Sequence, residues 1–434
     1  MLPGRSGAAS DAQVTLSQSD TGAGLPPGRL QATEARAASS ASRFAFGFRS
    51  VIAGGIAAAL VVAAFTLSAQ PGPGSNLALS LVFGAAFGFV LQRSRFCFLC
   101  NFRDLLDARD PRGMLGILTA FAVGVTGYTI VLGAWLPDPM SGRLPPEAFI
   151  GPVSWVLVVA GFVFGAGMAI SGSCVSAHLY RLGEGSPIAP FALIGTLIGF
   201  GLGFATWNTL YLSSVSTAPV IWLPGWLGYS GALLAALALL AVIAVPLLRL
   251  LPSHAGESPI GRHVLHLIFV ERWPAWIGGA AVGAIGIAAF LRVGPLGVTA
   301  EIGARARQAG DAFGLLPLRL EGLDTLRGCI TVVRDTLLTP NGLFIGGLML
   351  ASFAAALVAG QFRPAWPTAD QIVRGLAGGV LLGWGAMTGL GCTVGTLMSG
   401  IMAGAASGWV FGAAVFLGIA LTLRGGRRIG VLPI

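Results

Sequence analysis

The sequence predicts an all-α polytopic membrane protein whose two pseudo-symmetric, inverted halves bring broken, re-entrant helices together at a central path. Of its 434 residues, 55% are apolar and only 10% are charged, whereas a soluble domain has about 25% charged residues. Several apolar runs exceed the ~18 residues that indicate a membrane span. One such run, 383–395, is interrupted by glycines and a cysteine, and a similar interruption occurs earlier in the chain.

The two interruptions align without gaps when 218 positions separate them. The aligned pairs are Gly161 with Gly379, Gly165 with Gly383, Gly167 with Gly385, Cys174 with Cys392 and Leu179 with Leu397. Corresponding breaks in two halves are typical of transporters built from inverted repeats, which bind their substrate near the bilayer midplane. The repeat therefore predicts a substrate site where the two breaks meet.

Three parts are expected along the chain. Residues 1–42 are rich in Ala, Ser, Gly and Pro and predict a disordered cytoplasmic tail. Residues 43–250 form the first transmembrane half and residues 251–434 the second, with the boundary in the polar stretch 252–272. A cleaved signal peptide is not expected, because its apolar core should lie within the first ~30 residues.

Ten long apolar runs predict the principal spans, and short broken segments bring the expected total to roughly nine to eleven. They are 51–69, 76–92, 114–135, 153–170, 188–212, 229–250, 273–291, 343–359, 372–390 and 409–423. Short helices are expected after Cys174, after Thr299 and after Cys392. The connection 304–340, which contains Cys329, is expected to be part loop and part amphipathic helix.

The basic residues define an orientation in the membrane. The net charge of +9 comes from arginine without any lysine. Arginine clusters at 93–112, 249–272 and 424–428 predict that these segments and both termini lie in the cytoplasm. Because no basic run is interleaved with aromatic residues, nucleic-acid binding is excluded.

The breaks favour an anion path through the lipid bilayer. Inside the hydrocarbon region a broken helix survives only where protein surrounds it or where it lines a cavity. Each break exposes the N-terminus of a half-helix, whose free N–H groups and dipole attract anions. Two such ends facing each other would form an electropositive constriction without a full charge.

Cysteines occupy the starts of these half-helices. Cys174 and Cys392 follow the two aligned breaks, and Cys97 lies in a polar, arginine-flanked segment whose counterpart is expected to be Gly297. A neutral thiol donates S–H to an anion while a thiolate repels it, so protonated cysteines are expected. The alternative is that each cysteine only fills buried space, as free cysteines often do.

Other polar residues leave two interpretations open. The arginines either draw an anion toward the mouths of the path or only set topology; they are Arg95, Arg103, Arg181 and Arg334. His178 either faces the path or contacts a neighbouring helix.

Metal and cofactor signatures are weak. Cys97 and Cys100 form a CxxC that lacks the second ligand pair of a structural zinc site. His263 and His266 lie in a polar loop where solvation is the more common state. Because the sequence lacks a Walker motif, we expect neither ATP hydrolysis nor any cofactor.

Several of these motifs resemble the YeeE/YedE permeases over about residues 76–425. They are the stretch 378–395, Ser399–Gly400–Ile401, Ser407–Gly408–Trp409, Arg95–Phe96–Cys97, Phe102–Arg103–Asp104, and Ser173–Cys174 leading to Arg181–Leu182–Gly183–Glu184–Gly185. The chain departs from the family pattern at Ser173 and His178, and Cys100 and Cys329 are additional cysteines.

The resemblance implies an inner-membrane importer of thiosulfate or a related sulfur species, with Cys97, Cys174 and Cys392 contacting the substrate through S–H···S hydrogen bonds. It also implies a cytoplasmic sulfur carrier of the TusA type as a partner. The expected supporting residues are Gly172, Ser173, Gly391, Gly297, Arg95, Arg103 and Cys329.

The sequence therefore predicts a permease, not an enzyme, for thiosulfate or a related small sulfur-containing anion. A membrane thiol oxidoreductase or sulfurtransferase that uses the same cysteines covalently is the alternative from another class. A structural or assembly subunit with inert cysteines is a second alternative.

Overall fold

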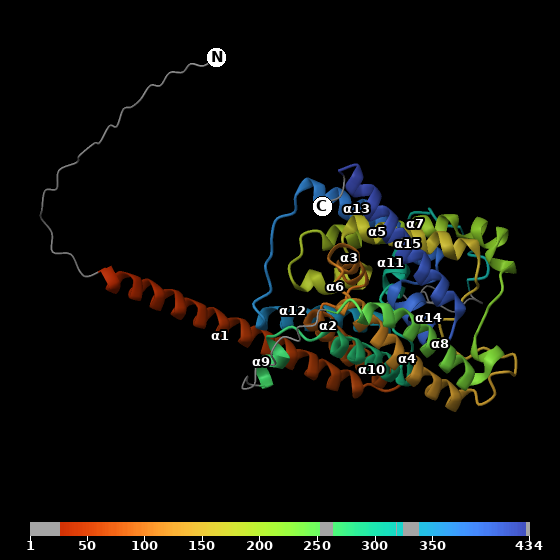
Figure 1. Ribbon diagram of the computed structural model, residues 1–434, viewed down its shortest axis with the longest axis horizontal. Coiled ribbons are helices and arrows are strands. Elements are labelled where there is room, and N and C mark those ends of the chain that lie inside the picture. The colour runs from red at the N-terminus through yellow and green to blue at the C-terminus, as the bar shows by residue number, and fades with distance from the viewer. Residues whose placement is uncertain (1–26, 252–263, 318, 324–337, 431–434) are drawn as a thin grey trace, which may run out of the picture. The chain divides into compact units, whose positions relative to one another are not determined.

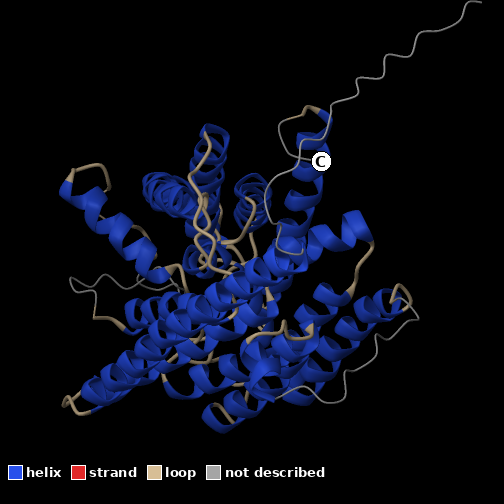
Figure 2. Cartoon of the chain, turned by 90° about the vertical axis from the view of Figure 1, so that its left-hand side faces the viewer, coloured by secondary structure: helices blue, strands red, loops and turns tan. Residues whose placement is uncertain are grey.

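The computed structural model describes residues 27–251, 264–317, 319–323 and 338–430. Helices joined by loops make up this part of the chain, and it contains no strand (Figure 2). Nine helices within the described ranges are long and apolar enough to cross a membrane, or up to ten if a bent pair counts as one span. This confirms the predicted all-α polytopic class and the expected number of spans.

Helix α1 (Pro27–Ser68) includes the first candidate span, Gly47–Ser68. Within the described residues, 27–48 belong to one compact unit and the chain from Arg49 onward belongs to a second. Residues 27–42 were expected in the disordered tail but are helical in the structure. The segment contains Ala, Arg, Gln and Glu, which favour helix. The remainder of the predicted tail, residues 1–26, lies outside the described residues.

The larger unit, from Arg49 onward, contains long helices, each of which overlaps a predicted span. The earlier elements are α2 (Gly74–Ser94), α3 (Phe98–Ala108), α4 (Arg112–Trp135), α5 (Trp155–Ser171), α6 (Val175–Gly183), α7 (Ala189–Ser213), η1 (Val215–Thr217) and α8 (Pro224–Leu248). The later elements are α9 (Val264–Phe269), α10 (Ala275–Arg292), α11 (Ala300–Ala312), α12 (Pro340–Val358), α13 (Ala369–Thr388), η2 (Thr393–Ser399), α14 (Gly400–Met402) and α15 (Ala406–Arg428).

The long helices of this unit pack in two groups (Figure 1). In one group α13 packs between α5 and α7, and α15 packs on α5. In the other group α2 packs on α12 and α10, and α10 packs on α4. Each of the short helices α3, α6, α11 and η2–α14 contacts at least one helix of the first group and at least one helix of the second. The two groups therefore enclose the short helices.

Glycines allow the long helices to approach closely. At four crossings a glycine lies so near a backbone carbonyl of the partner helix that a Cβ atom would overlap it. The pairs are Gly84 with Phe344, Gly279 with Gly116, Gly165 with Val415 and Gly383 with Thr196. Small residues at helix interfaces permit this kind of packing in membranes, which accounts for much of the chain's high glycine content.

Candidate functional site

Four short helices begin inside the helical bundle, and four buried residues occupy their N-cap positions. The N-caps are Cys97 for α3, Cys174 for α6, Thr299 for α11 and Cys392 for η2. Each of these side chains is at most 1% exposed. All three predicted path cysteines therefore lie at equivalent positions, and the fourth such position holds a threonine.

The first N–H groups of these four helices donate no hydrogen bond to the N-cap side chain. Other helices do have this hydrogen bond: the side chains of Ser154, Thr339 and Thr368 accept from the starts of α5, α12 and α13. Uncapped helix starts are anion-binding positions, because their N–H groups and dipoles point outward from the helix. The arrangement leaves four such starts near one another.

The four N-cap side chains are linked in series. The Cys97 thiol interacts electrostatically with the Cys174 thiol. Cys174 in turn interacts electrostatically with Cys392, and Cys392 interacts with the Thr299 side chain. The structure thus brings Cys97, Cys174 and Cys392 together and adds Thr299 to them.

Backbone amides face both central thiols. The Cys174 thiol approaches the amide of Ala177 and lies 3.2 Å from Ser176 Oγ. The Cys392 thiol approaches the amides of Val394 and Gly395, in the first turn of its own helix. An anion placed beside these thiols would therefore meet N–H donors from both half-helices.

The first break depends on Gly172, whose φ of 85° ends α5 in the left-handed region that favours glycine. Ser173 Oγ donates to the Gly172 carbonyl at 2.6 Å. His178 Nε2 lies 3.1 Å from Ser171 Oγ, which ties α6 back to the end of α5. His178 is 1% exposed, and Ser171 is the last residue of the neighbouring helix α5. Ser173 and His178 accordingly stabilise the break.

The second break depends on Gly391, whose φ is 154°. Thr396 Oγ1 donates to the Gly389 carbonyl at 3.0 Å. Positions 396 and 389 align with His178 and Ser171 in the 218-residue register, so each half-helix is tied back from the same place. The helix differs, however: the amide of Leu397 donates to the Cys392 carbonyl at 3.3 Å, and η2 is a π-helix.

A basic side chain lies next to the first break. Arg181 Nη2 donates to Cys100 Sγ at 3.1 Å, and Nη1 donates to the Gly172 carbonyl at 3.4 Å. The Cys100 thiol also interacts electrostatically with Cys97. Among the described residues no carboxylate pairs with Arg181. The series of thiols therefore ends at a cation that is available to an anion.

The remaining predicted residues are not among the four N-caps, and some lie outside the described ranges. Arg103 is exposed and pairs with Asp104 at 3.2 Å. Arg95 is exposed at the end of α2, close to Arg272. Burial, followed by the positive charge of Arg95, lowers the pKa of Arg272. Gly297 is buried two positions before the N-cap Thr299.

Three residues named in the sequence analysis, Cys329, Arg334 and His263, lie outside the described residues. Within the part of the chain that the structure describes, no group of three or more His, Cys, Asp or Glu side chains is arranged to hold a metal ion.

Sequence reasoning missed a buried polar network at the end of α2. Arg93 is 0% exposed, and its Nε donates to Gln92 Oε1 at 2.7 Å. Its Nη1 donates to the Phe269 carbonyl at 2.8 Å, and Gln92 Nε2 donates to Gln361 Oε1 at 2.7 Å. The network joins α2, α9 and the end of α12. Its place in an arginine cluster predicts only a topogenic role for Arg93, and no local sequence pattern indicates its distant partners.

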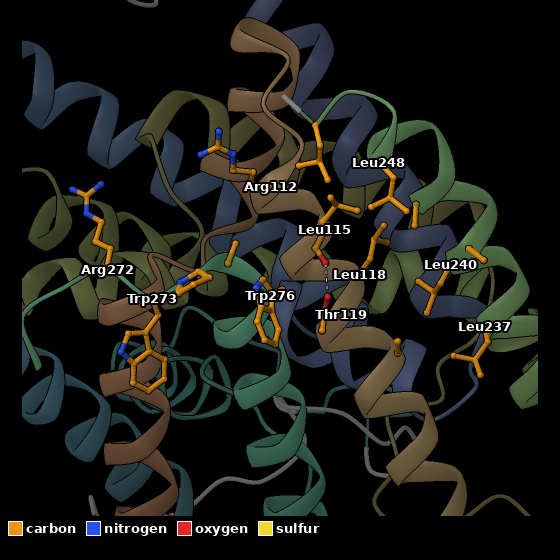
Figure 3. A pocket seen from close by; sticks show the side chains of 16 residues that line it. Arg112, Leu115, Leu118, Thr119, Leu237, Leu240, Leu248, Arg272, Trp273 and Trp276 are labelled. Atoms are coloured by element: carbon orange, nitrogen blue, oxygen red, sulfur yellow. Dashed lines mark hydrogen bonds between the residues drawn. The ribbon is translucent and has the colours of Figure 1, made fainter. Parts of the chain in front are cut away.

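A cavity of about 870 Å³ lies away from the thiols, between α4, α8 and the start of α10 (Figure 3). Its lining is mostly apolar, with Arg112, Arg272, Trp273 and Trp276 among the residues that Figure 3 labels. Leu248 in this lining is 52% exposed. Tryptophan and arginine beside exposed leucines are typical of a surface at the lipid–water interface, and we do not assign the substrate site there.

Broken helices that enclose a buried, linked set of thiols and uncapped helix starts define the class of membrane transport proteins. The chain belongs to the sulphur transport family, whose model matches residues 93–421.

Two relatives share most of their length with this chain. The thiosulfate transporter TsuA of Escherichia coli (strain K12) is 27% identical over 361 residues, covering 80% of this chain and 93% of the relative. The thiosulfate transporter TsuA of Spirochaeta thermophila is 28% identical over 343 residues, covering 76% of this chain and 93% of the relative. A probable transporter YedE of Salmonella typhimurium is 28% identical over 127 residues, or 29% of this chain and 28% of its own.

Proposed function

We propose that this protein is a bacterial inner-membrane permease that takes up thiosulfate through a path lined by Cys97, Cys174 and Cys392. One observation carries the proposal: three buried thiols lie in series at uncapped half-helix starts, in a chain of the sulphur transport family. The two full-length relatives described above are named as thiosulfate transporters.

The chemistry of the path suits a small sulfur anion. Neutral thiols donate weak S–H hydrogen bonds and are polarisable, which matches the terminal sulfur of thiosulfate. The helix starts offset the negative charge through backbone N–H groups, so the anion can move from thiol to thiol without a tight ion pair. Each thiol is buried, and passage therefore requires the surrounding side chains to move.

The two halves are proposed to be inverted repeats that meet at this path. Gly167 faces the carbonyl of Gly378, and Gly385 faces the carbonyl of Ala160; a Cβ on either glycine would lie 2.7 Å from that oxygen. The two contacts are equivalent in the 218-residue register, because Gly167 aligns with Gly385 and Ala160 aligns with Gly378. The same register aligns α5 with α13 and α7 with α15, so the packing of α7 on α13 is equivalent to the packing of α15 on α5.

The orientation proposed from the arginine clusters places both termini in the cytoplasm. Arg427 at the end of α15 pairs with Asp107 at the end of α3, through Nη1 and Oδ1 at 2.6 Å. Two of the clusters therefore lie on the same side of the bundle. A TusA-type sulfur carrier on that side would receive the imported sulfur.

The alternative of a thiol oxidoreductase or sulfurtransferase is not favoured, because the family is one of transporters. Cys97, Cys100, Cys174 and Cys392 are all free thiols. Mass spectrometry of the purified protein after exposure to thiosulfate would detect a covalent sulfur adduct if the cysteines acted covalently.

Uptake of radiolabelled thiosulfate by cells that lack their own importer tests the proposal. Cys97→Ala, Cys174→Ala and Cys392→Ala should each reduce uptake to background while the protein level in the membrane stays normal. Ser80→Ala is the matched control, because it removes one buried polar atom in α2 that bonds only to the Asn76 carbonyl. Retained uptake in all three cysteine variants would refute the path, and competition by sulfite, sulfate and selenite would define the ion.

A further inference from the structure

The fourth N-cap, Thr299, differs chemically from the other three. Its side chain is 0% exposed, and its Oγ1 makes no hydrogen bond that meets normal geometry to any described residue, although it lies near the Cys392 thiol. Thr393, the first residue of η2, is also 0% exposed, and its Oγ1 has no partner within the described ranges. Two buried hydroxyls without partners thus flank Cys392 in sequence and in space.

An unpaired hydroxyl in the interior is costly. Leaving such a group without a hydrogen bond disfavours the folded state, because the hydroxyl loses its hydrogen bonds to water and gains none in the protein. Other buried threonine hydroxyls are paired: Thr196 Oγ1, for example, donates to the Ala192 carbonyl at 2.7 Å. Among the described hydroxyls, that of Tyr128 is also buried without a partner, but it does not belong to a helix start. A valine would fill the volume of Thr299 without the cost. Only a bound group that accepts a hydrogen bond would offset this cost at Thr299.

The substrate of the proposed permease has two chemically different ends. Thiosulfate has a polarisable terminal sulfur and three sulfonate oxygens that accept strong hydrogen bonds from hydroxyl and amide donors. The path is divided in the same way. Amides face both Cys174 and Cys392, but the hydroxyls differ: Ser176 Oγ is paired with the Cys174 thiol at 3.2 Å, whereas Thr299 presents an unpaired hydroxyl beside Cys392.

We propose that Thr299 forms an oxygen-binding subsite with the amides around Cys392, so that the sulfonate end of the anion lies at Thr299 and its terminal sulfur lies toward Cys174 and Cys97. This inference rests on the proposed function. Thr393 supplies the second hydroxyl of the subsite. The anion therefore passes with a fixed orientation, and recognition requires both an oxygen end and a sulfur end.

Initial rates of radiolabelled thiosulfate uptake into proteoliposomes test the subsite with the full chain. Thr299→Val should raise the apparent KM by about tenfold or more, because a hydrogen bond to a charged group contributes about 1.5–3 kcal/mol. Thr299→Ser keeps the hydroxyl and should restore the wild-type KM, and Thr299→Cys should give an intermediate value. Thr196→Val is the matched control and should keep the wild-type KM.

The outcomes separate the subsite from the proposed function. An unchanged KM in Thr299→Val, or an equal defect in Thr299→Ser, overturns the subsite alone while wild-type uptake stands. Absence of wild-type thiosulfate uptake overturns the proposed function and the subsite with it. If Thr299→Val does not reach the membrane, the order of KM for Thr299→Ser and Thr299→Cys decides: an equal or lower value for the cysteine variant overturns the subsite.

Discussion

The two helix breaks share their register but differ in their polar surroundings. At the first break the hydroxyls of Ser173 and Ser176 have partners, and Arg181 lies beside the Gly172 carbonyl. At the second break Thr393 has an unpaired hydroxyl, and position 399, which aligns with Arg181, is a serine that bonds to the Leu296 carbonyl at 3.3 Å. Both breaks keep a thiol at the N-cap.

The difference shows which features the repeat retains. Both breaks have a glycine that ends the helix and a thiol at the N-cap. Both also have a hydrogen bond from the half-helix back to the end of the long helix, from His178 to Ser171 at the first break and from Thr396 to Gly389 at the second. The cation occurs only at the first break, and the unpaired hydroxyls occur only at the second. A common scaffold therefore presents different donors to the two ends of an anion.

The largest expected difference concerns the two glycines. Alanine at Gly172 meets open space and costs only the left-handed backbone, about 1–2 kcal/mol. Alanine at Gly391 adds an overlap, because its Cβ would lie 2.5 Å from Thr396 Oγ1, so we expect a loss of about 3 kcal/mol or more. Thermal unfolding of the detergent-solubilised variants measures this.

Gly346→Ala serves as the control for that pair, since its Cβ would have no atom within 4 Å and its helix would tolerate alanine. Equal Tm losses for Gly172→Ala and Gly391→Ala would contradict the account of the second break.

The next prediction tests the cation that distinguishes the first break. Arg181→Gln should lower kcat/KM for thiosulfate uptake by about tenfold to a hundredfold, because it removes hydrogen bonds from a charged donor to an anion. Arg103→Gln should have little effect, since Arg103 forms an exposed pair with Asp104. Similar uptake defects in the two variants would instead indicate a general electrostatic role for arginine at the membrane surface.

The smallest effects concern the ties that both breaks share. Thr396→Val removes one buried hydrogen bond and should lower stability by about 1 kcal/mol. Ser171→Ala should cost somewhat more, because it also leaves His178 Nε2 buried without its partner. Chemical or thermal unfolding of both variants measures the difference. A larger loss of stability for Thr396→Val than for Ser171→Ala would contradict the predicted order.

The sequence was sufficient to predict the long helices and the two aligned breaks, because apolar runs and glycine–cysteine patterns are local signals. It did not identify Thr299. Gly297 was expected opposite Cys97, whereas in the structure the N-cap that corresponds to Cys97 is Thr299. The linker Val293–Thr299 is longer than its counterpart Arg95–Cys97, and the sequence does not show which residue of a longer linker begins the helix.

Long-range partners were equally inaccessible from sequence. Arg93 resembled its exposed neighbours in a basic cluster, yet it is buried against Gln92 and Gln361. The glycine content predicted close helix packing, but the particular crossings, such as Gly383 with Thr196, depend on which helices become neighbours. The pairing of Arg181 with Cys100 likewise depends on α6 approaching α3.

The four uncapped helix starts have a consequence for the valence of the transported ion. Each start is equivalent to roughly half an elementary charge, about two in all, and no change of pH can remove this charge because backbone amides do not titrate. A dianion would balance it, while a monoanion would leave an excess of positive charge. The number of interrupted helices thereby sets a preference between ions of equal size, and competition of thiosulfate uptake by divalent and monovalent sulfur anions at equal concentration measures that preference.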